Sequence, residues 1–141
     1  MITTIEKTFH FEAAHCLPKH RGKCKELHGH SYKVTIRATG SIKRGTNDPD
    51  NGMVIDFDVL SNAFRTEVFD LLDHKYLNHV LPPVIIEETT AELIAEFILR
   101  RLTHGGALPI DSVTVWETET SCATVSLTEI EKFNIGVRPS E

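Results

Sequence analysis

The sequence predicts an α+β fold in which two helices cover one face of a four-stranded antiparallel sheet, with the elements in the order ββααββ. Four segments alternate apolar and polar residues, which is the two-residue period of a half-buried strand. Two segments between them carry apolar residues at the spacing of an amphipathic helix. The length of 141 residues suits one hydrophobic core, so we expect residues 1–141 to form a single domain.

The first two strands are predicted over residues 9–13 and 32–38, where the alternation is clearest. Residues 16–30 lie between them, are rich in Lys, Gly and His, and follow neither period, which indicates a long functional loop. Turn-forming residues fill positions 45–52. The second strand should therefore end there, and the chain should return briefly as a strand through residues 53–55.

The first helix should begin after Asp56, whose carboxylate is placed to cap the first turn, and end near Asp73 after about four turns. Its apolar positions are Phe57, Leu60, Phe64, Val68 and Leu71. In the second helix, Thr89 and Glu92 have the spacing of a capping box at the start, and Gly105–Gly106 marks the end. Each helix thus has an apolar face that can pack on the sheet.

The last two strands are predicted around residues 113–115 and 123–127, separated by a polar turn at residues 117–121. A four-stranded sheet leaves two edges with unpaired backbone groups. Pairing between subunits is a common way to cover such edges, so the sequence favours an oligomer.

The composition excludes several classes of function. Twenty acidic against fifteen basic residues give a net charge of -5, which argues against nucleic acid or an anionic membrane as the main partner. No apolar run reaches the roughly 18 residues of a membrane-spanning helix, and the N-terminus lacks the pattern of a signal peptide. We therefore expect a cytoplasmic protein, in which three cysteines do not suggest a disulfide framework.

Three histidines form a candidate metal site. His28 and His30 are two residues apart at the start of the second strand, so their side chains should lie on the same face. If the first two strands pair as a hairpin, His15 at the end of the first strand comes beside them. Three neutral imidazoles with an open fourth position are typical of catalytic zinc, whereas the alternative is that these are ordinary polar loop residues.

Cys24 lies four residues before His28 and between Lys23 and Lys25, two cations that favour the thiolate. It could be a fourth ligand in a closed structural zinc site, a base or nucleophile beside an open site, or an ordinary loop thiol. Lys19 and Arg21 complete a group of four cations in this loop, which could hold a polyphosphate or simply face solvent.

Two further groups could carry chemistry. Asp73 and His74 are adjacent at the end of the first helix, where the carboxylate could tune proton transfer by the imidazole. Glu117 stands at a strand end, where it could accept two parallel N–H bonds from a guanidine-like edge. In each case an ordinary structural role is the alternative.

Four motifs together resemble the family of 6-pyruvoyl-tetrahydropterin and 6-carboxytetrahydropterin synthases. They occur in order between residue 5 and about residue 128: Phe11-Glu12-Ala13-Ala14-His15, Cys24-x-x-x-His28-Gly29-His30, Leu72-Asp73-His74 and Trp116-Glu117-Thr118. The resemblance implies a tunnelling fold (T-fold), with three subunits closing a β-barrel and two trimers stacking into a hexamer.

The resemblance also implies the roles of individual residues. His15, His28 and His30 would hold Zn²⁺, and Cys24, Asp73 and His74 would transfer protons. Glu117 would anchor the pterin, and Thr90 and Thr118 would line its pocket. The substrate would be 7,8-dihydroneopterin triphosphate, whose vicinal hydroxyls a zinc ion can chelate and acidify, and no redox cofactor is required.

Within the family, the three residues between Cys24 and His28 favour the bacterial carboxy-synthase branch, as does Val54-Ile55-Asp56-Phe57. That branch releases acetaldehyde and triphosphate and leads towards 7-deazaguanine (queuosine-type) nucleosides. Residues 88–90 differ from the Asn-Pro-Thr type sequence usual in it, and the loop over residues 42–51 is long. The alternatives are the 6-pyruvoyl product from the same substrate and, from another class, a non-catalytic structural zinc module with Cys24 as fourth ligand.

Overall fold

The computed structural model describes residues 1–106 and 108–134, which contain a sheet with the strand order β3-β1-β2-β4-β5. The centre of the sheet is a long hairpin of β1 (Thr3–His15) and β2 (His28–Gly40). β4 (Ile110–Thr118) pairs antiparallel with β2, and β5 (Ser121–Ser126) pairs antiparallel with β4. The alternating segments of the sequence therefore form the strands that they predict.

The sheet differs from the prediction at one edge. β3 (Lys75–Tyr76) pairs parallel with Ala13 and Ala14 of β1, so the sheet has five strands and is mixed, not four-stranded and antiparallel. A two-residue strand is too short to show a period in the sequence. It forms because the chain leaving the first helix runs along the free edge of β1.

The first helical segment runs without a break through α1 (Phe57–Phe64), a π-helical stretch (Arg65–Phe69) and α2 (Asp70–Leu72). The Asp56 side chain accepts a hydrogen bond from the backbone N–H of Asp58 at 2.9 Å, so the predicted cap is confirmed. The segment also ends where the sequence indicates, next to Asp73.

The second main helix, α4 (Ala91–Thr103), begins differently from the prediction. Its N-cap is Thr90, whose hydroxyl accepts from the backbone N–H of Leu93 at 3.3 Å. The predicted capping box of Thr89 with Glu92 is therefore wrong. Thr89 is buried and turned towards β1, where its side chain has other partners.

A third correction concerns the chain after the second strand: β2 ends at Gly40, before the predicted turn at residues 45–52, and residues 53–55 form no strand. The backbone of Lys43 accepts from the N–H of Gly52 at 2.7 Å and donates to the carbonyl of Met53 at 2.9 Å. These two bonds close the turn-rich loop without extending the sheet. The structure also contains two short helices that the sequence pattern does not predict, α3 (Leu77–Val80) and α5 (Glu129–Asn134).

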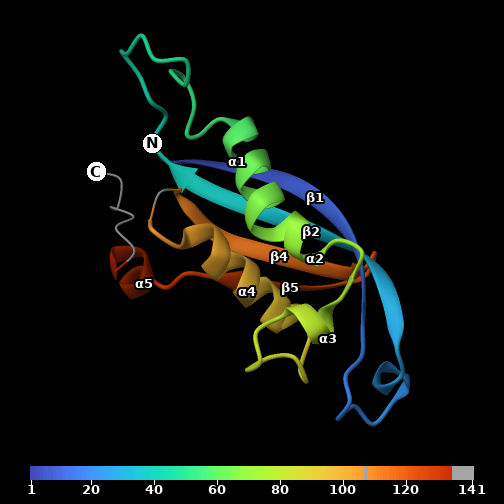
Figure 1. The fold of residues 1–141 in the computed structure, drawn as a ribbon. Helices are drawn as coiled ribbons and strands as arrows, with labels where there is room; N and C mark the ends of the chain where they lie inside the picture. Colours follow the sequence, from blue (N-terminus) through green and yellow to red (C-terminus); the bar gives the residue numbers. More distant parts are fainter. Residues whose placement is uncertain (107, 135–141) are drawn as a thin grey trace.

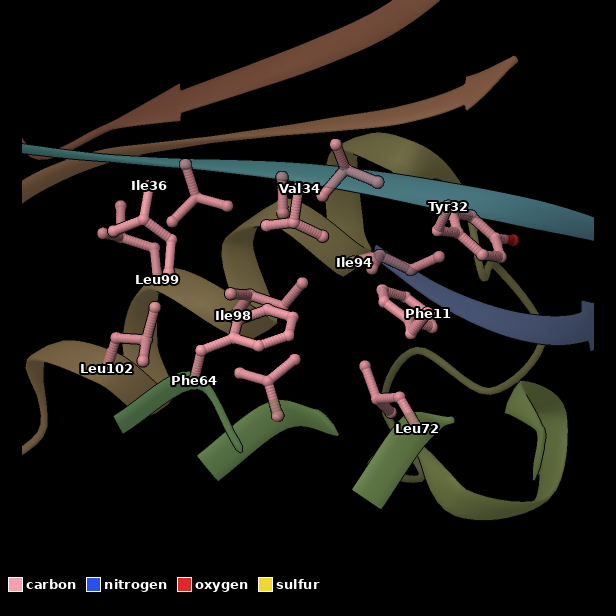
Figure 2. Packing of buried hydrophobic residues seen from close by; sticks show 14 of the residues in the cluster. Phe11, Tyr32, Val34, Ile36, Phe64, Leu72, Ile94, Ile98, Leu99 and Leu102 are labelled. Carbon is pink, nitrogen blue, oxygen red and sulfur yellow. The ribbon is translucent and has the colours of Figure 1, made fainter. Parts of the chain in front are cut away.

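The core lies between the sheet and the helices. Figure 1 shows α1 and α4 on the same face of the sheet, and Figure 2 shows side chains from both layers meeting there. The labelled core residues are 0–4% exposed: Phe11, Tyr32, Val34, Ile36, Phe64, Leu72, Ile94, Ile98, Leu99 and Leu102. Burial of this apolar surface is the main stabilising contribution and fixes which face of each strand points inward.

Two loops project from opposite ends of the β1–β2 hairpin (Figure 1). Residues 16–27, which include Cys24, lie at the end where His15 and His28 face each other. Residues 41–52 lie at the other end, next to α1. Within the described residues, no helix is long and apolar enough to cross a membrane.

Candidate metal centre and active site

The three predicted histidine ligands lie together at one end of the sheet. His15 pairs directly with His28 across the hairpin, and His30 pairs with Ala13, two residues further along the same face. One potential ligand atom from each imidazole lies within 4.8 Å of the other two. The register of β1 against β2 thus brings together side chains that are 13 to 15 residues apart in the sequence.

Hydrogen bonds to carbonyl groups orient two of the rings. Nδ1 of His15 lies 2.8 Å from the carbonyl oxygen of Thr89, and Nδ1 of His28 lies 2.7 Å from that of Glu26. A carbonyl only accepts, so each Nδ1 carries the proton and each Nε2 keeps its lone pair. This carbonyl–histidine arrangement is typical of metal ligands.

The separation of the ring nitrogens fits a zinc ion. The Nε2 atoms of His15 and His30 are 3.1 Å apart, and two tetrahedral ligands at Zn–N distances of about 2.0–2.1 Å are about 3.3 Å apart. Burial and the neighbouring imidazoles lower the pKa of His15 to about 4, and burial lowers the pKa of His30. At neutral pH the two rings are therefore neutral and able to donate lone pairs.

Cys24 is not part of the histidine cluster. Within residues 1–106 and 108–134, the side chains close enough to share a metal ion are the three imidazoles alone. Cys24 lies in a turn of 3₁₀-helix (Lys23–Lys25), where its carbonyl accepts from the backbone N–H of Leu17 at 2.8 Å. This arrangement favours an open metal site with three protein ligands over a closed site with a sulfur ligand.

Glu117 approaches the cluster from β4. Its Oε1 is 4.0 Å from Nε2 of His15, and its side chain is 27% exposed, so substrate could reach it. Burial and the charge of Glu92 raise the pKa of Glu117. The ionised form of such a partly buried carboxylate is stabilised when N–H donors or a cation approach it.

Tyr32 supplies a buried hydroxyl beside this site. Its ring lies edge-on to the ring of His30, with centroids 5.3 Å apart, and its hydroxyl has no hydrogen-bond partner among the described residues. In Figure 2 the hydroxyl points away from the apolar side chains. Burial and the charge of Glu117 raise the pKa of Tyr32, so the phenol stays neutral.

Asp73 and His74 form a hydrogen-bonded pair at the end of α2, with Asp73 Oδ2 2.7 Å from Nδ1 of His74. The other carboxylate oxygen accepts from the backbone N–H of Glu12 at 3.0 Å, and this bond, together with His74, lowers the pKa of Asp73. The His74 side chain is 78% exposed. Asp73 is thus ionised and holds an accessible imidazole by one nitrogen.

Two of the three residues predicted to transfer protons are hydrogen-bonded to each other, Asp73 and His74. In the described part of the chain, the Cys24 side chain makes no hydrogen bond to Asp73 or His74. Of the four loop cations, Lys19 forms an exposed ion pair with Glu87 at 3.2 Å. Arg21, Lys23 and Lys25 are exposed.

Thr90 and Thr118 both have local hydrogen bonds. Thr90 caps α4, and the Thr118 hydroxyl lies 3.4 Å from the Thr120 hydroxyl in the turn between β4 and β5. Each hydroxyl can donate as well as accept, and among the described residues neither makes a hydrogen bond outside its own turn. The sequence reasoning missed two residues that support the cluster, Thr89 and Asn78, because their contacts are more than 60 residues away in the chain.

Comparison with known proteins identifies the family to which this chain belongs. The model of the 6-pyruvoyl tetrahydropterin synthase family matches residues 4–128, and the chain belongs to this family. A 6-carboxy-5,6,7,8-tetrahydropterin synthase of Synechocystis is 44% identical over 119 residues, which cover 84% of this chain and 89% of the relative.

Two more relatives extend the comparison. A Haemophilus influenzae protein, also named 6-carboxy-5,6,7,8-tetrahydropterin synthase, is 34% identical over 134 residues, covering 83% of this chain and 94% of its own. Among solved structures, the Caenorhabditis elegans 6-pyruvoyl tetrahydropterin synthase superposes with a TM-score of 0.77 at 26% identity, covering 91% of this chain and 97% of the worm chain.

Proposed function

We propose that this protein acts as a zinc-dependent 6-carboxy-5,6,7,8-tetrahydropterin synthase. It would convert 7,8-dihydroneopterin triphosphate and one water molecule to 6-carboxytetrahydropterin, acetaldehyde and triphosphate. The observation that carries the proposal is the cluster of three imidazoles within 4.8 Å, with the Glu117 carboxylate beside it. The names of the Synechocystis and Haemophilus influenzae relatives support the carboxy product.

His15, His28 and His30 would hold the zinc ion. A zinc ion bound there would polarise the vicinal hydroxyls of the substrate side chain and make them more acidic. Glu117 would accept N–H bonds from the pterin ring, and its partial burial strengthens such charge-assisted bonds. Thr90 and Thr118 would contribute hydroxyl groups to the pterin pocket.

Cys24, Asp73 and His74 would transfer protons. The Cys24 thiolate would remove the carbon-bound proton next to the ring, and His74 would exchange protons with the side-chain oxygens. Asp73 would orient His74 and stabilise its protonated form, because the carboxylate lies 2.7 Å from Nδ1. The sulfur would come from a neighbouring subunit in a hexamer of two trimers. In support, the Cys24 side chain makes no hydrogen bond to Asp73 or His74 within the described part of one chain.

The proposal also covers the compartment, the pathway and the domain in which the reaction takes place. We place the reaction in the cytoplasm, on the route towards 7-deazaguanine nucleosides, and assign it to one T-fold domain over residues 1–141. Among the described residues no strand pairs with the outer edge of β5, and barrel closure between subunits would cover that edge.

A second candidate is the 6-pyruvoyl tetrahydropterin synthase reaction on the same substrate, which the similarity to the Caenorhabditis elegans enzyme favours. Incubation of the zinc-loaded protein with dihydroneopterin triphosphate, followed by mass analysis, separates the two. Acetaldehyde with the carboxy product supports our proposal, whereas a pyruvoyl product supports the alternative. Zinc binding without turnover would indicate a structural zinc module.

A further inference from the structure

Thr89 lies against the ring of His15 and contacts it twice. Nδ1 of His15 is 2.8 Å from the Thr89 carbonyl oxygen and 3.1 Å from its hydroxyl oxygen. Thr89 is 0% exposed and His15 is 1% exposed, so water cannot replace either contact. We propose that Thr89 is a positioning residue that fixes the tautomer and orientation of His15 for metal binding, an inference that rests on the metal site proposed above.

The hydroxyl of Thr89 is set to accept. Its oxygen lies 3.3 Å from the carbonyl oxygen of Cys16, and a carbonyl cannot donate, so the hydroxyl proton points there. The hydroxyl oxygen therefore presents lone pairs to Nδ1 of His15. Two acceptors face this nitrogen, which must carry the proton, and Nε2 is left free towards His30.

The backbone beside His15 is fixed by another residue. The Asn78 side chain accepts from the N–H of Cys16 at 3.0 Å and donates to the Cys16 carbonyl at 2.9 Å. With the backbone held in this way, the ring of His15 depends on its own side-chain rotation for its direction. Thr89, which lies in the segment that leads into α4, restricts that rotation.

His15 depends on a distant residue in a way that His28 does not. The ring of His28 bonds to the carbonyl of Glu26, two residues earlier in the same loop. Thr89 is 74 residues from His15 in the sequence. The geometry of the histidine cluster therefore depends on the packing of the α4 entry against the end of β1.

The first test is the zinc affinity of Thr89 variants, measured by competition with a chromophoric chelator. Thr89→Val keeps the shape and removes the hydroxyl, and we expect roughly tenfold weaker zinc binding. Thr89→Ser keeps the hydroxyl and should bind zinc as the wild type does. Thr103→Val is the matched control, because Thr103 is a buried threonine on α4 whose hydroxyl donates to the Leu99 carbonyl at 2.7 Å.

The second test uses the metal-free protein and nitrogen-15 NMR of the histidine side chains. In the wild type, His15 should be the Nδ1–H tautomer. Thr89→Val keeps the carbonyl acceptor and loses only the hydroxyl, so its Nδ1 proton should exchange faster with the tautomer unchanged. An Nε2–H tautomer in the wild type would overturn the proposal even if no variant folds. This measurement does not require metal binding.

The outcomes separate this inference from the proposed function. If the wild type binds no zinc, the proposed metal site fails, while the tautomer still reports on Thr89. If the wild type binds zinc and folded Thr89→Val matches it in affinity and in the exchange rate of the His15 Nδ1 proton, the positioning role is wrong. Equal losses in Thr89→Ser and Thr89→Val would also overturn it, because Ser retains the hydroxyl and the loss would then not follow that group.

Discussion

The Asp73 carboxylate accepts a hydrogen bond from the backbone N–H of Glu12 at 3.0 Å, across 61 residues of sequence. The backbone N–H of His74 donates to the Glu12 carbonyl at 2.6 Å. These bonds hold His74 at a φ of 57°, a conformation that residues other than glycine rarely adopt. The end of α2 is therefore fixed on β1 through Glu12, while the His74 ring, held at Nδ1 by Asp73, remains exposed.

Asp73→Asn should change the acid dependence of stability. Because the pKa of Asp73 is lower in the folded protein than in the unfolded chain, its contribution is present above about pH 4 and is lost as the pH falls through the folded pKa. The unfolding free energy of Asp73→Asn should therefore fall less steeply on acidification. Urea denaturation at a series of pH values measures this, with exposed Asp70→Asn as the control. Identical profiles for wild type and Asp73→Asn would contradict it.

The metal site should contain no sulfur. Cys24→Ala is expected to keep one zinc ion per chain, because the three imidazoles supply the protein ligands of an open site. Substitution of His15, His28 or His30 by Ala should abolish stoichiometric binding. X-ray absorption of the substrate-free protein should show no Zn–S shell near 2.3 Å, and Cys122→Ala is the control thiol. A sulfur shell that disappears in Cys24→Ala would place Cys24 among the ligands.

Glu117→Gln should weaken substrate capture without loss of zinc. The amide replaces one acceptor oxygen with a donor, so a charge-assisted pair becomes a neutral contact. A cost of roughly 1.5–3 kcal/mol corresponds to a fall in kcat/KM of about ten- to a hundredfold. Steady-state kinetics with zinc analysis measure both quantities, and Glu119→Gln, in the turn after β4, is the control. An unchanged kcat/KM would remove Glu117 from the pterin site.

Cys24→Ala and His74→Ala subunits should complement each other. Each variant alone should be nearly inactive if both residues transfer protons. After random mixing and reassembly in equal amounts, a site that takes Cys24 from one chain and His74 from another is intact with a probability of one half times one half. About a quarter of wild-type activity should then return.

Hybrid oligomers must be verified by native mass spectrometry before this activity is interpreted. Activity that stays at the single-variant level in confirmed hybrids would refute a site shared between subunits. If each chain held its own complete triad, every subunit in the mixture would still lack one residue, and mixing could not restore activity. Recovery of activity therefore indicates a site shared between subunits.

The sequence by itself determined the elements that depend on local patterns. The alternation of apolar residues predicted the four long strands, and the helical spacing of apolar residues predicted the two main helices. Asp56 predicted the N-terminal cap of the first helix. The two-residue spacing of His28 and His30 placed both on one face, because strand geometry repeats every two residues. Patterns of this kind can be recognised without knowing which distant residues are in contact.

Only the tertiary structure decided how distant residues meet. β3 forms because the chain after α2 reaches the edge of β1, and Thr89 turns towards His15 instead of capping α4. The sequence contains a threonine at both 89 and 90, and either can cap a helix by its local chemistry. In the folded chain Thr90 is the cap, whereas the carbonyl and hydroxyl oxygens of Thr89 both lie against Nδ1 of the buried His15, where they supply acceptors that water cannot.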